Sequence, residues 1–261
     1  MTTPAMPLSW AVCTDAGRRR TSNEDSHSTR PDVGLFIVAD GMGGHVAGEV
    51  ASRVAVESIS AFIQETAGAD RNRTWPFPFE PDLSFEGNRL KAAFRLANRR
   101  IASAIADSQD LRGMATTASA ILVGKDHACV AHIGDSRVYA LHDSELRQVT
   151  DDHSWVEEQV RAGMLTPAAA RQHPWRNVVT RALSGAEDPE IDVVQMKPTP
   201  GDRYLLCSDG LFGVVGDDQI AKILSDRKAS LEDLCARLID AANEAGGPDN
   251  ITALIIQIDA S

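Results

Sequence analysis

The chain has 261 residues, 43% of them hydrophobic, which is enough to bury a sizeable core. Its 37 acidic and 26 basic side chains give a net charge of −11, which excludes general binding to nucleic acid or to an anionic membrane surface. No apolar run approaches the roughly 18 residues that span a membrane, and residues 1–10 lack a secretory signal pattern, so we expect a cytoplasmic protein.

The first part of the chain predicts two strands followed by two helices. Apolar runs predict strands at 9–15 and 34–40. Apolar residues at helical spacing predict helices at 48–66 and 88–106, each with one apolar stripe that packs on a sheet. The loop at 68–87 is rich in proline and aromatic residues, and we expect its aromatic side chains to pack back onto the body of the protein.

The middle of the chain predicts antiparallel strands. Apolar runs indicate strands at 117–124, 128–134 and 136–141. Residues 124–127 and 142–144 are short polar stretches typical of the tight turns that join neighbouring antiparallel strands.

The last part of the chain begins with an irregular stretch at 151–190, which holds one predicted short helix at 154–162. Asp217 and Ser230 are the predicted N-caps of two later helices. The remaining predicted elements are strands at 191–196, 203–208 and 251–258 and helices at 217–225 and 230–245. The chain is therefore of mixed α and β structure.

Four aspartates lie at the ends of predicted strands. Asp40, Asp135 and Asp209 each follow an apolar run, and Asp249 precedes the last strand. A single Asp after a strand is usually part of a turn. If all four converge, however, each pair at about 4 Å repels by about 4 kcal/mol at an effective dielectric of 20, and bound cations would relieve that repulsion. Oxygen ligands without cysteine favour Mg²⁺ or Mn²⁺ over zinc, and two such ions can activate a water for in-line attack on phosphorus.

The glycine-rich turn after Asp40 has two interpretations. Residues 41–45 read Gly-Met-Gly-Gly-His, and His45 is the one nitrogen ligand close to the acids in sequence. A nucleotide-binding loop is disfavoured, because the segment lacks the Lys-Ser or Lys-Thr of a P-loop and does not fit the dinucleotide pattern. We expect instead that the glycines let the Gly41 carbonyl approach a cation.

Two features near the N-terminus can serve phosphate chemistry. Cys13 and Arg19 have the Cys-x5-Arg spacing of a thiolate phosphatase, but Asp15 lies in the intervening loop, and thiolate activation needs an electropositive setting. Arg18 and Arg20 flank Arg19, and an arginine can hold two phosphate oxygens with its planar guanidinium. A solvated basic turn is the alternative for each arginine.

Seven short segments follow one another along the chain. They are Arg20-x-x-Asn23-Glu24-Asp25, Asp40-Gly41-Met42-Gly43-Gly44-His45, Thr116-Thr117, Gly134-Asp135-Ser136-Arg137, Asp152-His153-Ser154, Ser208-Asp209-Gly210-Leu211 and Gly247-Pro248-Asp249-Asn250-Ile251-Thr252. In this order they resemble the motifs of the PPM family, the metal-dependent protein phosphatases typified by protein phosphatase 2C. The resemblance extends over residues 9–258.

The resemblance implies an α+β fold in a single catalytic domain, residues 1–261. Two antiparallel sheets flanked by helices would form a four-layer α-β-β-α sandwich with the metal centre at one edge. Residues 151–190 resemble the flap that lies beside the active site in this family. We expect a monomer.

The resemblance also implies a metal-binding role for five residues. Asp40 would bridge two divalent cations, Mn²⁺ or Mg²⁺, the Gly41 carbonyl would bind the second, and Asp209 with Asp249 would hold the first. Bacterial members bind a weaker third metal, for which Asp135 and Asp209 match the ligands.

Four further residues match the family's outer contacts and catalytic groups. Glu24 and Asp25 would act mainly through metal-bound waters. Arg20 would bind the phosphate, and His45 would be the general acid for the leaving serine or threonine oxygen. One departure is Ala115, where the family usually has glycine before two threonines, and alanine there would cost ~1 kcal/mol if the backbone needs a positive φ.

The implied activity is hydrolysis of phosphoserine and phosphothreonine by metal-activated water, without a phosphoenzyme. The implied partners are phosphoprotein substrates, with serine/threonine kinases or their targets among them, and no nucleic acid or membrane. The alternative is a catalytically weak or inactive phosphatase-like module that binds phosphoproteins. It is disfavoured because the ligand positions are filled.

Overall fold

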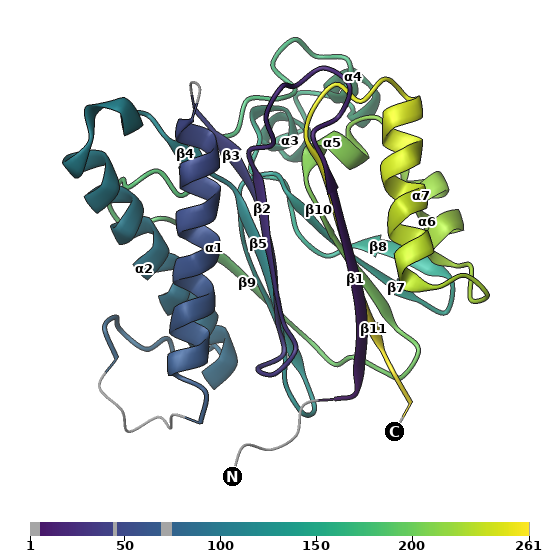
Figure 1. The fold of residues 1–261 in the computed structure, drawn as a ribbon, viewed down its shortest axis with the longest axis horizontal. Coiled ribbons are helices and arrows are strands. Elements are labelled where there is room, and N and C mark those ends of the chain that lie inside the picture. The colour runs from purple at the N-terminus through teal and green to yellow at the C-terminus, as the bar shows by residue number, and fades with distance from the viewer. Residues whose placement is uncertain (1–5, 44–45, 69–74, 261) are drawn as a thin grey trace.

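The computed structural model of this protein describes residues 6–43, 46–68 and 75–260. Two antiparallel sheets pack face to face, and helices cover the outer face of each sheet (Figure 1). The predicted α-β-β-α sandwich is therefore confirmed.

Every strand pairing in the two sheets is antiparallel. The first sheet has the order β2 (Asp25–Arg30), β3 (Leu35–Met42), β5 (Ala118–Val123), β6 (Ala128–Ile133) and β9 (Asp192–Met196), with β4 (Ala115–Thr116) paired to β3. The second sheet has the order β1 (Leu8–Asp15), β11 (Ile251–Ile258), β10 (Arg203–Cys207), β7 (Arg137–His142) and β8 (Glu145–Gln148).

The helices form the two outer layers and one end of the sandwich. The first sheet is covered by α1 (Ala47–Glu65) and α2 (Phe85–Asp107), which is followed by the short η1 (Gln109–Leu111). The second sheet is covered by α5 (Asp209–Phe212), α6 (Asp217–Leu224) and α7 (Leu231–Glu244). At the top of Figure 1 lie α3 (Trp155–Arg161) and α4 (Pro167–Arg171). No helix of the described ranges is long and apolar enough to cross a membrane.

The central strands are continuously apolar because both of their faces are buried. On β3, Leu35 and Ile37 pack beneath α1 and α2, whereas Phe36 and Val38 point into the space between the sheets. These four side chains are 0% exposed. Strand β11 alternates in the same way between the α7 side and the space between the sheets, so three apolar layers hold the four structural layers together.

Several elements differ from the sequence prediction. Strands β2 and β8 were not predicted, because their sequences Asp-Ser-His-Ser-Thr-Arg and Glu-Leu-Arg-Gln carry too few apolar residues to give a period-2 pattern. Helix α2 begins at Phe85, earlier than predicted, because the Ser84 side chain caps it by accepting from the Gly87 N–H. Ser230 is the N-cap of α7 as predicted, but the prediction for Asp217 was wrong, since Gly216 is the N-cap of α6.

The aromatic residues of the loop before α2 pack as expected in the part of the loop that the structure describes. Trp75 lies 6.1 Å from Phe62 and 5.3 Å from Phe85, ring centroid to centroid. Phe77 packs against the core beneath α1 and α2. Ala115 lies in β4 and is not among the described residues with positive φ, so the expected strain at this position is absent.

Candidate active site

The predicted metal-binding acids come from distant segments and meet at one end of the sandwich. Asp25 and Asp40 are cross-strand partners where β2 begins and β3 ends. Asp209 begins α5 directly after β10, and Asp249 lies just before β11. The side chains of Asp40 and Asp209 lie close enough for their charges to repel each other. The convergence that the strand ends predicted is therefore present.

These acids raise one another's pKa values. Burial raises the pKa of Asp40 well above its usual range, and repulsion from Asp25 and Asp209 adds to the effect. Burial with repulsion from neighbouring acids likewise raises the pKa of Asp209 to about 6, of Asp25 to about 7 and of Asp135 to about 8. Repulsion among neighbouring carboxylates favours bound protons, and a divalent cation can take the place of those protons.

Asp25 provides a test of whether the site suits a cation. Its Oδ2 accepts hydrogen bonds from the Ser208 hydroxyl at 2.7 Å and the Thr252 hydroxyl at 2.6 Å. Its Oδ1 is buried and has no hydrogen-bond partner among the residues that the structure describes. A buried carboxylate oxygen without a partner is costly. A hard divalent cation, or water held by it, would satisfy this oxygen, so the donor chemistry fits Mg²⁺ or Mn²⁺.

Asp249 already has partners for both of its oxygens. Its Oδ2 accepts from Arg20 Nη2 at 2.7 Å, and its Oδ1 accepts from the Asn250 N–H at 2.9 Å. Over residues 6–43, 46–68 and 75–260, no three acidic, histidine or cysteine side chains are grouped closely enough to enclose a metal ion as they stand. The predicted ligand Asp249 and the predicted phosphate-binding Arg20 are therefore neighbours that neutralise each other.

Glu24 and the glycine-rich turn are joined by close backbone packing. The Glu24 carbonyl accepts from the Gly41 N–H at 3.1 Å. A Cβ on Gly41 would overlap the carbonyl of Gly48, and a Cβ on Gly48 would overlap the Glu24 carboxylate. The two glycines thus let the start of α1 approach the ends of β2 and β3, a packing reason that the sequence did not indicate. His45 lies outside the described residues.

Three polar side chains that support the acids had no predicted role. Ser208 and Thr252 hold Asp25, as described above, and the Asn250 side chain accepts from the Glu24 N–H at 2.8 Å. Asn250 Nδ2 also donates to the carbonyls of Ala16 and Ser22. All three occur in the sequence motifs, but only the fold shows which atoms they contact.

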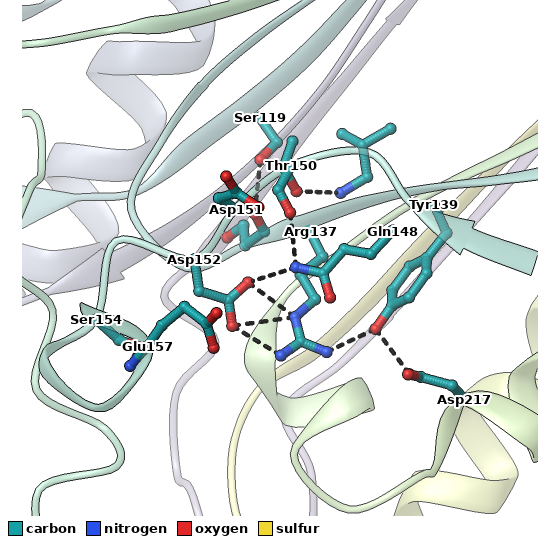
Figure 2. A network of polar contacts seen from close by, with 12 residues as sticks. Ser119, Arg137, Tyr139, Gln148, Thr150, Asp151, Asp152, Ser154, Glu157 and Asp217 are labelled. Carbon is teal, nitrogen blue, oxygen red and sulfur yellow. Dashed lines mark hydrogen bonds and ion pairs between the residues drawn. The ribbon is translucent and has the colours of Figure 1, made fainter. Parts of the chain in front are cut away.

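Arg137 is the centre of a second polar cluster beside the acids (Figure 2). Its Nε and Nη2 donate to the two Asp152 oxygens at 2.9 and 2.7 Å, and its Nη1 donates to the Tyr139 hydroxyl at 2.7 Å. Tyr139 in turn donates to Asp217 at 3.0 Å. The guanidinium also lies 3.8 Å above the Phe212 ring. We call Arg137, Asp152, Tyr139 and Asp217 the arginine network. It ties β7 to α5, to α6 and to the start of the flap.

A cleft of about 880 Å³ opens beside both clusters. Arg20, Asp135, Asp209 and Asp249 line it at the acidic end. The predicted flap, which contains α3 and α4, forms another wall of the cleft. The cleft is therefore large enough for a phosphorylated side chain together with neighbouring peptide residues.

The thiolate alternative has no support from the geometry. Burial raises the pKa of Cys13, whereas a thiolate nucleophile needs a lowered pKa. Neither Cys13 nor Arg19 is among the residues that line the cleft.

Comparisons with known proteins agree with the fold and the order of motifs. The family model described as protein phosphatase 2C matches residues 14–254. The serine/threonine protein phosphatase PstP of Mycobacterium tuberculosis is 38% identical over 251 residues, which is 96% of this chain but 45% of PstP, so this chain spans less than half of that relative. The serine/threonine phosphatase stp of Listeria monocytogenes is 36% identical over 94% of each chain.

A solved structure gives the same result. The crystal structure of the catalytic domain of PstP in complex with two manganese ions superposes with a TM-score of 0.82 at 36% identity, covering 97% of this chain and 99% of that domain. Sequence, motif order and fold thus agree over nearly the whole chain. The chain belongs to the protein phosphatase 2C family.

Proposed function

We propose that this protein is a metal-dependent phosphatase that hydrolyses phosphoserine and phosphothreonine in proteins by direct attack of water, without a phosphoenzyme. The observation that carries the proposal is the meeting of Asp40, Asp209 and Asp249 at one end of the sandwich, beside the unpartnered buried Asp25 Oδ1. Such a concentration of acid is costly unless divalent cations neutralise it.

The residues that would hold two cations are Asp40, the Gly41 carbonyl, Asp209 and Asp249, with Asp135 available for a weaker third. The manganese complex of PstP supports Mn²⁺, and Mg²⁺ suits the same oxygen ligands. When bound, the cations would neutralise phosphate charge and activate a water for in-line attack. Glu24 and Asp25 would orient water around them, since Ser208 and Thr252 hold only one Asp25 oxygen.

Arg20 and His45 would act on the substrate. Among the described residues, the Arg20 guanidinium has one ion pair, with Asp249, and its side chain is 53% exposed, so it can exchange that partner for two phosphate oxygens. His45, four residues beyond Gly41, would donate a proton to the leaving serine or threonine oxygen.

The substrates would be phosphoproteins, as the names of the related serine/threonine phosphatases indicate. Serine/threonine kinases and their targets are the proposed partners, and the absence of a spanning helix in the described residues is compatible with action in the cytoplasm.

The test is a titration of Mn²⁺ and Mg²⁺ against turnover of matched peptides that carry phosphoserine, phosphothreonine or phosphotyrosine. We expect turnover of the first two only with metal, and loss of turnover when a chelator is added. Cys13→Ser is the control and should keep full activity. Metal binding without turnover of any phosphopeptide would instead identify a binding module. Loss of activity in the Cys13→Ser variant would support the thiolate mechanism.

A further inference from the structure

Two unpaired arginines face the active-site cleft from the flap. Arg171 ends α4 and Arg176 lies in the loop that follows, and both line the cleft that contains Asp209 and Asp249. Both are exposed. Neither guanidinium has a hydrogen bond or ion pair to any residue within the described ranges.

The other arginines of the cleft already have partners. Arg20 is paired with Asp249, and Arg137 is held by Asp152 and Tyr139. In a protein with a net charge of −11, this leaves the flap wall as the place where the cleft can receive additional negative charge.

The backbone that carries these arginines is fixed by aromatic packing. The Trp155 ring lies 4.8 Å from both the His173 and the Trp175 rings. The backbone N–H of Trp155 donates to the Val178 carbonyl at 2.8 Å, and the backbone N–H of Arg176 donates to the His173 carbonyl at 3.1 Å. Because the loop is held in place, less ordering entropy is lost when a ligand binds to its side chains.

The charge of the cleft also differs between its walls. Asp217 and Asp218 line it at the start of α6, whereas the flap contributes Arg171 and Arg176 together with one acid, Glu157. A second negative charge on a bound peptide would therefore be attracted near Arg171 and Arg176 and repelled near the start of α6.

We propose that Arg171 and Arg176 form a second anion-binding subsite, which selects phosphopeptides with another phosphate or carboxylate close to the phosphoryl group that is hydrolysed. The proposal rests on the proposed function, because it places the hydrolysed phosphate at Arg20. A phosphate and a carboxylate both present several oxygen acceptors, which arginine binds through paired N–H groups.

The test compares kcat/KM for matched phosphothreonine peptides with Mn²⁺ present. One peptide carries a single phosphate, and others carry a second phosphoserine, or a glutamate, at each position up to four residues on either side. The test variant is the double variant Arg171→Gln/Arg176→Gln. The control is Arg147→Gln, because Arg147 is an exposed arginine on β8 that does not line the cleft.

We expect the protein to prefer the best doubly phosphorylated peptide over the singly phosphorylated one by about tenfold or more, since hydrogen bonds to charged groups contribute at that level. The double variant should bring this ratio close to one, and Arg147→Gln should keep it. The glutamate peptides show whether a carboxylate suffices. Equal ratios for the unsubstituted protein and the double variant would overturn the subsite while leaving the phosphatase proposal intact. Failure to hydrolyse any peptide would overturn the phosphatase proposal itself.

Discussion

Two polar clusters border the same cleft and differ in their charge balance. The acidic cluster of Asp25, Asp40, Asp209 and Asp249 has one arginine partner among the described residues, Arg20, and that arginine contacts only Asp249. In the arginine network, Arg137 donates to Asp152 through Nε and Nη2 and to the Tyr139 hydroxyl through Nη1, at 2.7 to 2.9 Å.

This difference indicates that the acidic cluster is a binding site and that the arginine network has a structural role. In the arginine network the Arg137 donors are paired with Asp152 and Tyr139, so the network holds β7, α5, α6 and the predicted flap together. The acidic cluster is incomplete, because it contains raised pKa values and an unpartnered buried oxygen. A divalent cation would supply the positive charge that the acidic cluster lacks.

The largest effect is expected from Asp40→Asn and Asp209→Asn. Asparagine keeps the shape of the side chain and removes the charge that a cation needs, so kcat/KM on a phosphothreonine peptide should fall on the order of a thousandfold. The folded state should not be destabilised, because each change relieves repulsion within the cluster. A variant that keeps activity within about threefold of the unsubstituted protein would exclude that residue as a ligand.

The next effect concerns stability and distinguishes the arginine network from the acidic cluster. Arg137→Met leaves the Asp152 carboxylate, whose side chain is 9% exposed, without its main partner, so the free energy of unfolding should fall by about 3 kcal/mol. Adding Asp152→Leu should recover much of the loss, because the unpaired charge is then removed. Denaturant unfolding of the two variants measures this. A double variant as unstable as Arg137→Met would contradict the pairing.

Arg20 should give a smaller change and one limited to activity. Arg20→Gln removes a charged donor for phosphate, which should lower kcat/KM by about tenfold to a hundredfold. Because its salt bridge with Asp249 is partly exposed, stability should change by less than about 1 kcal/mol. Arg20→Lys should recover only part of the activity, since lysine lacks the planar fork. Full activity of Arg20→Gln would remove Arg20 from the phosphate site.

The last effect is a pH dependence that the acidic cluster should show in a chelator. Burial raises the pKa of Asp25 from its ordinary value of 3.8 to about 7, so the folded protein binds this proton more tightly than the unfolded chain. The stability contribution of Asp25 is therefore complete below pH 4 and is lost as the pH rises through about 7. Compared with Asp25→Asn, the unsubstituted protein should lose stability progressively between these values. A difference in unfolding free energy between the two proteins that does not change with pH would contradict the raised pKa of Asp25.

The apolar patterns predicted strands and helices well where these bury apolar residues, whereas the sandwich was implied by the family resemblance. Strands such as β3 and β11 are buried on both faces, so their apolar runs stand out, whereas β2 and β8 are largely polar and depend on their neighbours for hydrogen bonding. The early start of α2 depends on the Ser84 cap, which the apolar stripe does not reveal.

The site was predicted as a set of acids but not as a network. Each acid follows or precedes an apolar run, so its place at a strand end can be read from the sequence. The hydroxyls on Asp25, the Asn250 contacts and the Arg137 pairing join residues that are far apart in the chain. Such contacts depend on the packing of the two sheets, which no local pattern encodes.

The most direct test of the account is anomalous diffraction at the manganese edge from crystals grown with Mn²⁺. We expect manganese peaks between Asp40 and Asp209, with an Asp249 oxygen released from Arg20 to become a ligand. An active protein whose manganese lies elsewhere, with no metal beside Asp40 and Asp209, would contradict the claim that these acids converge in order to bind cations.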